Sequence, residues 1–456
     1  MQKGKNSLYI LSIIWFLYAL FVFYIERGDS FAFHNKLTFY VFVSYVLCVI
    51  SWLARGNRVF SLFLFFVLYS FFSNTAQSII YSFSESNLIL SVYRSYSMSD
   101  ICYMLKYNFL CIAALNLGVN LYLKKGNNIT QEQISSFYTQ KKKEPNKKIF
   151  EILLYLSLLS VFIYTIYQLR LRQTMTYNEL TESREYNSYF LVFGSIILGL
   201  YFIILKRHVK LIIYSWVFYI FAYMLAGTRS MAIIYVGALL ITIPFIYPRL
   251  FQRKYYPYIF AVVFVGFSLI SVISETRTGA IGTVSSGSEG LLFSALSTMM
   301  EMGASQLPIM ISIENFPQYQ YSQTIIYFLL LGFIPAVMID PLTPENWHIH
   351  LGTWVNEVSN TTTNELGFSW LAESYLNYGE FGWIFPILYG YFIAYAENGS
   401  LKRIMQGEYV LSICLLSFLC RQIFFARGQI GLSIDFYRPI VYVLILWIII
   451  KHTKSK

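Results

Sequence analysis

Residues 8–25 read LYILSIIWFLYALFVFYI, an uncharged apolar stretch of bilayer length. A helix needs about 20 such residues to cross the hydrocarbon core of a membrane. The whole chain has the same character, because 57% of its 456 residues are hydrophobic, only 12% are charged and the mean hydropathy is +0.54. Soluble domains carry about 25% charged residues. The sequence therefore predicts an all-α polytopic membrane protein that forms a single membrane domain over residues 1–456.

Apolar runs of this kind recur along the chain and predict about 12 transmembrane helices. They cover residues 8–25, 37–54, 59–79, 101–123, 149–167, 188–205, 211–226, 231–247, 257–274, 368–397, 409–426 and 431–450. A further apolar run at 324–339 is ambiguous, because it could either span the membrane or enter it and return on the same side.

The distribution of basic residues decides between these alternatives. Cytoplasmic connections of membrane proteins carry an excess of Lys and Arg. Basic clusters occur at every second predicted connection, from Lys3 onward, so they all share one side. If 324–339 does not span, Lys402, Arg403 and the C-terminal lysines join that side. We therefore expect both termini to be cytoplasmic and the 324–339 segment to be re-entrant or interfacial.

Two connections stand out by their length. Residues 275–367 form one large outer loop with helix-like stretches at 291–314 and the apolar segment at 324–339. Loops longer than about 15 residues are usually functional or disordered, and the composition of this one does not indicate disorder. Residues 124–148 form a lysine-rich cytoplasmic loop that reads as a solvated linker. The net charge of +11 is thus explained by membrane topology, and no nucleic-acid partner is expected.

Arginine dominates the basic residues of the predicted outer side, where only Lys36 and Lys106 are lysines. One explanation is that lysine simply marks the cytoplasmic face. The other is that arginine was retained because its planar fork binds phosphate through two hydrogen bonds. Arg229, between two spans, and Arg421, within an apolar run, are at membrane depth, where a charge is by default functional or paired. Snorkelling to the headgroups would also account for Arg229, and pairing with Asp435 for Arg421.

The stretch at 367–382 reads GFSWLAESYLNYGEFG and is the most unusual in the chain. Glu373, Asn377 and Glu380 are spaced i, i+4, i+7, which predicts one polar face of a helix. Gly379 and Gly382 break the helix or allow a close approach. A carboxylate there could orient or deprotonate a hydroxyl group. For Glu373, a favourable charge near a helix N-terminus is an equally good explanation.

The remaining candidates for chemistry are weaker. His348 and His350 could face one metal ion, but no third ligand is near in sequence, so no metal is expected. The five cysteines lack metal-ligand spacing and read as packing residues. No glycine-rich phosphate loop or nucleotide-binding fingerprint is present, so no cofactor is expected. Arg172 and Arg184 belong to an outer loop rich in both charges, where ordinary solvation is the simpler interpretation.

Three features together resemble the O-antigen polymerase (Wzy) family of oligosaccharide repeat unit polymerases. The first is the Gly-Thr-Arg-Ser element at 227–230 between two spans. The second is the large loop, opened by Arg277 and containing an apolar segment that ends at Pro335. The third is the 367–382 stretch. Where relatives often carry Arg after the Ile-Pro of the loop, this chain has Ala336.

The resemblance implies a membrane glycosyltransferase of the bacterial inner membrane. It would polymerise undecaprenyl-pyrophosphate-linked oligosaccharide repeat units into O-antigen or capsular polysaccharide on the periplasmic face. Its partners would be the membrane lipids and a chain-length regulator. The large loop would then be periplasmic. Glu373 is the predicted catalytic residue, with His348 as the second candidate. The predicted substrate-binding residues are Arg229, Arg277, Arg421, Arg172, Arg184, Asn377 and Glu380.

Two other functions fit the same layout. An O-antigen ligase, which transfers glycan to lipid A-core, would use a loop histidine with arginine. A lipid-linked oligosaccharide flippase, a transporter and not an enzyme, also has about 12 spans, but it should lack a large outer loop.

Overall fold

The computed structural model describes residues 2–83, 93, 95–126, 128–140, 148–174, 188–226, 229–247, 302–316, 324–331, 336–345, 351–359 and 368–428. Within these residues every regular element is a helix. The prediction of an all-α protein is confirmed for this part of the chain.

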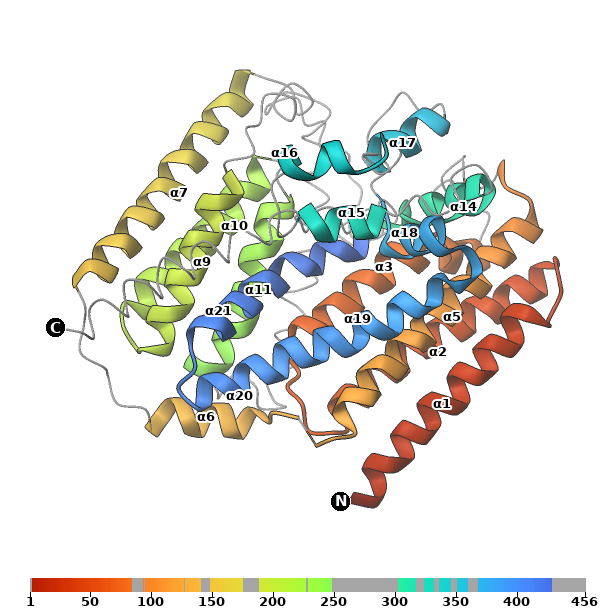
Figure 1. The fold of residues 1–456 in the computed structure, drawn as a ribbon, viewed down its shortest axis with the longest axis horizontal. Coiled ribbons are helices and arrows are strands. Elements are labelled where there is room, and N and C mark those ends of the chain that lie inside the picture. Colours follow the sequence, from red (N-terminus) through yellow and green to blue (C-terminus); the bar gives the residue numbers. More distant parts are fainter. Residues whose placement is uncertain are drawn as a thin grey trace.

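The long helices pack side by side in one bundle (Figure 1). They are α1 (Gln2–Tyr24), α2 (Phe31–Leu53), α3 (Leu62–Phe83), α5 (Met98–Leu123), α7 (Lys148–Thr174), α9 (Ser188–Ile204), α10 (Val209–Leu225), α11 (Arg229–Ile246), α19 (Ile384–Ala394), α20 (Ser400–Met405) and α21 (Val410–Gln422). The π-helical turn η7 (Tyr395–Gly399) joins α19 to α20, and the 3-10 helix η8 (Ile423–Arg427) follows α21.

Among the described residues, six helical stretches are long and apolar enough to cross a membrane. They are Asn6–Tyr24, Phe31–Leu53, Leu62–Phe83, Met98–Leu123, Lys148–Leu171 and Val410–Arg427, and three shorter apolar helices lie at 190–204, 209–225 and 231–246. The predicted spans at 257–274 and 431–450 lie outside the described residues. A multi-pass membrane protein is therefore supported, while the total of about 12 spans stays a prediction.

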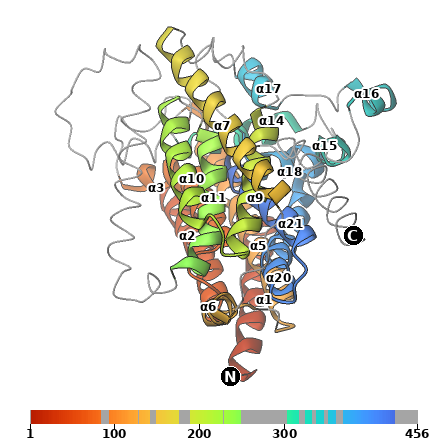
Figure 2. The ribbon, with the colours of Figure 1, turned by 90° about the vertical axis from the view of Figure 1, so that its left-hand side faces the viewer.

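The basic connections between the long helices gather at one end of the bundle, which we call the basic end. The N-terminus and the short helix α6 (Gln131–Gln140) lie there (Figures 1 and 2). Lys206 Nζ donates to the carbonyl of Thr139 at 3.2 Å, and Gln131 Nε2 donates to that of Pro244 at 2.7 Å. The basic clusters that alternate along the sequence, as far as they are described, thus share one end of the molecule.

The short helices gather at the opposite end, which we call the loop end (Figures 1 and 2). They are α14 (Gln306–Asn315), α15 (Thr324–Leu331), α16 (Ala336–Ile339), η4 (Asp340–Leu342), α17 (Leu351–Val358), α18 (Trp370–Tyr378) and η6 (Gly379–Trp383). Helix α15 has 8 residues. The residues on both sides of α15 lie outside the described part of the chain, so the re-entrant or interfacial course of 324–339 stays a prediction.

Helix α14 enters the bundle, although the sequence placed this segment in an external loop. Gln306 Nε2 donates to Ser78 Oγ at 2.7 Å, and the Ser78 amide donates to Gln306 Oε1 at 3.2 Å. A methyl group added at Gly303 would lie 3.0 Å from the Ala76 side chain. Ala76 is about two turns, or roughly 10 Å, inside the loop end of α3. Part of the predicted loop therefore packs against α3 inside the bundle and forms hydrogen bonds with Ser78.

Candidate functional site

The unusual stretch at 367–382 folds as the helix α18 followed by the tight turn η6. Ser369 caps α18, because its Oγ accepts the Leu371 amide at 3.3 Å. Gly379 ends the helix with a φ of +56°, a conformation that L side chains rarely adopt. A methyl group at Gly382 would lie 2.3 Å from Tyr107 Oη and 2.5 Å from the Ser374 carbonyl oxygen. Gly379 therefore ends the helix and Gly382 allows the close packing, which are the two effects predicted for these glycines.

Glu373 and Asn377 share one buried face of α18, as their spacing predicts. Thr324 Oγ1 donates to Glu373 Oε1 at 3.1 Å. The Asn377 side chain donates to Thr324 Oγ1 at 2.8 Å and accepts the Ile325 amide at 3.3 Å. The two side chains thus hold the N-terminus of α15 against α18. Glu373 also lies in the first turn of α18, where a negative charge is favourable.

Helix α15 is fixed at a second point by Tyr327. The Tyr327 hydroxyl donates to Asp340 Oδ1 in η4 at 2.7 Å. Burial and this carboxylate raise the pKa of Tyr327 to about 12. The phenol therefore stays protonated at physiological pH and can donate this hydrogen bond to Asp340.

Glu380 does not share the face of Glu373 and Asn377. The positive φ of Gly379 redirects the chain, so Glu380 lies in η6 and is exposed. Tyr103 Oη in α5 donates to Glu380 Oε1 at 3.2 Å, and Tyr375 Oη lies 3.2 Å from Tyr103 Oη. The prediction of one continuous polar face is wrong for Glu380, because the helix ends before it.

A polar cluster inside the bundle was missed by the sequence analysis. Ser369 Oγ donates to Asn74 Oδ1 at 2.7 Å, and Asn74 Nδ2 donates to Ser70 Oγ at 3.1 Å. Asn108 Nδ2 of α5 donates to the Asn74 carbonyl at 2.8 Å. Ser70, Asn74 and Ser78 are spaced i, i+4, i+8 in a predicted membrane span, which is the signal that could have predicted this buried polar stripe.

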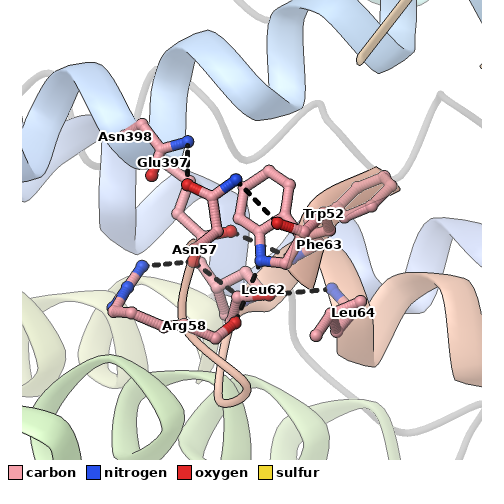
Figure 3. A network of polar contacts seen from close by, with 9 residues as sticks. Trp52, Asn57, Arg58, Leu62, Phe63, Leu64, Glu397 and Asn398 are labelled. Carbon is pink, nitrogen blue, oxygen red and sulfur yellow. Dashed lines mark hydrogen bonds and ion pairs between the residues drawn. The ribbon is translucent and has the colours of Figure 1, made fainter. Parts of the chain in front are cut away.

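The basic end contains a buried ion pair that was also missed (Figure 3). Arg58 Nη2 contacts Glu397 Oε1, and the two side chains are 1% and 0% exposed. The Glu397 carboxylate also accepts the amides of Leu62 at 3.2 Å and Phe63 at 3.0 Å. These amides open α3, so the carboxylate both pairs with Arg58 and caps a helix N-terminus. The signal that could have predicted this ion pair is Glu397, an acidic residue at the end of the predicted span 368–397.

Among the predicted arginines, only Arg421 has a described side chain. It is 3% exposed in the last turn of α21, which confirms a buried guanidinium. Phe425, one turn further on, lies with its ring 6.3 Å from that of Trp370 in α18. Arg421 is therefore about one turn away from a residue that packs against the start of α18. Its suggested partner Asp435 lies outside the described residues.

The other predicted site residues are placed only by their backbone or not at all. Arg229 is the first residue of α11, and Arg172 lies in the last turn of α7. Arg184, Arg277 and His348 lie outside the described residues. Among the described residues no group of three His, Cys, Asp or Glu side chains could hold a metal ion.

The family model described as O-antigen polysaccharide polymerase Wzy matches residues 6–456. The chain belongs to the O-antigen polymerase Wzy family. The match covers both halves of the bundle, whereas the sequence motifs were concentrated in the last half. No curated protein and no solved structure matches the chain.

Family membership gives the loop end its context. Wzy polymerases join O-antigen repeat units, which are lipid-linked oligosaccharides, in a membrane. Four of the predicted site residues have described side chains, and all four lie toward this end. They are Glu373, Asn377, Glu380 and Arg421. The roles of the individual residues are proposals, which we develop below.

Proposed function

We propose that this protein is a glycosyltransferase that polymerises undecaprenyl-pyrophosphate-linked repeat units into O-antigen or capsular polysaccharide. The reaction takes place on the periplasmic face of the bacterial inner membrane, and both termini of the protein are cytoplasmic. The observation that carries the proposal is the match of the Wzy family over residues 6–456. The gathering of basic connections at one end supports the orientation, since positive charge marks the cytoplasmic side.

The leaving group of this reaction is a lipid pyrophosphate, which gains negative charge as the glycosidic bond to it breaks. Preorganised cations at that position stabilise the transition state. Arg421 is proposed for this role because its guanidinium is buried in the last turn of α21, directly before η8. Arg229 and Arg277 are proposed with it, and Arg172 and Arg184 are proposed to contact the glycan. The donor's own sugar–phosphate bond supplies the driving force, so neither nucleotide nor metal is needed.

The acceptor is a sugar hydroxyl of the incoming repeat unit, and it needs a proton acceptor within hydrogen-bond distance. The proposed source is a carboxylate of the stretch Glu373–Glu380, with His348 as the alternative. Membrane lipids surround the bundle, and a chain-length regulator is the proposed protein partner.

Deletion of the gene in the parent bacterium, followed by gel analysis of the surface glycan, tests the proposal. We expect core capped by a single repeat unit, because flipping and ligation still occur. Bare core with long glycan on the lipid carrier would identify a ligase instead. Bare core with single units on the cytoplasmic leaflet would identify a flippase. Full-length ladders in the deletion strain would overturn the proposal, and a plasmid copy of the gene provides the control.

A further inference from the structure

The two carboxylates at 373 and 380 have opposite surroundings. Glu373 is 0% exposed, and its Oε1 accepts a hydrogen bond from Thr324. A sugar hydroxyl must come within about 2.6–3.2 Å of its proton acceptor. To reach Glu373, the substrate would have to displace the N-terminus of α15. Glu380 is exposed, so its carboxylate is accessible without any rearrangement.

One oxygen of the Glu380 carboxylate accepts a hydrogen bond from Tyr103, which is itself paired with Tyr375. Tyr103 Oη donates to Oε1 at 3.2 Å, and Tyr375 Oη is in turn 3.2 Å from Tyr103 Oη. The Tyr375 ring also meets the Tyr107 ring edge-on at 4.9 Å. Among the described residues, no group donates to Glu380 Oε2. One carboxylate oxygen is therefore fixed by the protein, and the other is available to a ligand.

The surroundings of Glu380 suit a substrate that arrives from the lipid. Phe381 and Ile384, next to Glu380 in the chain, are 64% and 46% exposed. Exposed apolar side chains of this size on a membrane protein face lipid. Lys106 Nζ lies 5.8 Å from the centre of the Tyr103 ring, which places a cation close to the carboxylate. A carboxylate and a cation at the lipid edge match a hydroxyl-bearing sugar on a phosphate-linked lipid.

We propose that Glu380 is the general base that takes the proton of the acceptor hydroxyl, that Tyr103 and Tyr375 position it, and that Glu373 positions α15. This inference rests on the proposed polymerase function. In the step, the O–H bond of the acceptor breaks and its proton moves to Glu380 Oε2. The oxygen forms a bond to the anomeric carbon of the donor, and the carbon–oxygen bond to pyrophosphate breaks with its electron pair on the leaving oxygen. Glu380 then releases the proton to water.

The test uses the purified full-length protein in liposomes with repeat units linked to polyprenyl pyrophosphate. Glu380→Gln keeps the hydrogen bond from Tyr103 but cannot accept a proton. We expect kcat to fall by about 10²- to 10⁴-fold with little change in KM. The acidic limb of the kcat pH profile should disappear in Glu380→Gln and persist in Glu380→Asp. Glu408→Gln, an exposed residue at the basic end, is the matched control and should behave as wild type.

The positioning roles have readouts of their own. Tyr103→Phe should lower kcat by roughly 10-fold and keep the acidic limb of the pH profile. Glu373→Ala and Thr324→Val each remove the hydrogen bond between these two side chains, so both should increase the labelling rate of a cysteine placed at Ile326. Glu380→Gln should leave that rate unchanged.

Several results would overturn the assignment. One is a Glu380→Gln protein whose kcat stays within about two-fold of wild type. Another is loss of the acidic limb in Glu373→Gln but not in Glu380→Gln. A Glu380→Gln protein that disappears from the membrane would show a structural role instead. A wild-type protein that does not lengthen the glycan would overturn the proposed function, and this assignment with it.

Discussion

Replacing Glu397 by Gln should destabilise the protein strongly, although the change is nearly isosteric. The amide oxygen of Gln can replace only one of the two carboxylate oxygens that accept the Leu62 and Phe63 amides, and the guanidinium of Arg58 loses its counter-charge. Both side chains are almost completely buried, at 1% and 0% exposed. Removing one partner of such a pair costs about 3–5 kcal/mol, or roughly a 150- to 5,000-fold change in the unfolding equilibrium.

The same reasoning predicts a compensating second change. Arg58→Met together with Glu397→Gln removes both charges, so the double variant should recover the part of the lost stability that comes from the unpaired guanidinium. Arg58→Met alone should cost less than Glu397→Gln alone. Its remaining carboxylate still accepts two amides at the positive end of α3.

Unfolding of the purified protein by SDS in mixed micelles, followed by circular dichroism, measures these differences. The matched control is Glu151→Gln, because Glu151 pairs with Arg207 and His208 at side chains that are 24% to 27% exposed. Such partly exposed pairs contribute about 0–1 kcal/mol. If Glu397→Gln costs no more than this control, or if the double variant is as unstable as the single one, the reasoning from burial is wrong.

Three further predictions follow from the structure. Reporters that are active on only one side of the membrane, fused after Lys142, Pro344 or Lys454, should give a periplasmic signal only at Pro344. A periplasmic signal at Lys454 would mean that 324–339 spans the membrane. Arg421→Lys keeps the charge but loses the fork, so polymer length by gel should fall while the membrane level by immunoblot is unchanged; full activity would refute bidentate contact. Gly382→Ala should cost about 1–3 kcal/mol in the SDS titration, because its methyl group would overlap Tyr107; Gly399→Ala, where the nearest atoms are 3.7 Å away, is the tolerated control.

The helices were predictable because the bilayer forces the backbone to satisfy its own hydrogen bonds. A run such as 8–25 or 101–123 has no alternative to a helix in hydrocarbon, and α1 and α5 occupy these positions. The shared face of Glu373 and Asn377 was predictable for the same reason, since one helical turn separates them. These features depend on local sequence alone.

The remaining features depend on contacts that local patterns do not encode. Arg58 and Glu397 are 339 positions apart, so no local pattern around either residue indicates that they form a pair. Glu380 was assigned to the face of Glu373 because the spacing rule assumes an unbroken helix. Gly379 was recognised as a breaker, but the direction of the chain after a left-handed residue is set by packing against α14 and α5.

The insertion of α14 into the bundle has a consequence for attempts to change the product of such an enzyme. Transplanting the large loop from a relative is an obvious route to a polymerase with a new sugar preference. Gln306 and Gly303, however, are matched to Ser78 and Ala76 on α3. A loop taken from a relative would contain an α14 whose contact residues match the α3 of that relative. The transferable unit is therefore the loop together with the α3 face that receives it, two segments far apart in the gene that have to be exchanged as one.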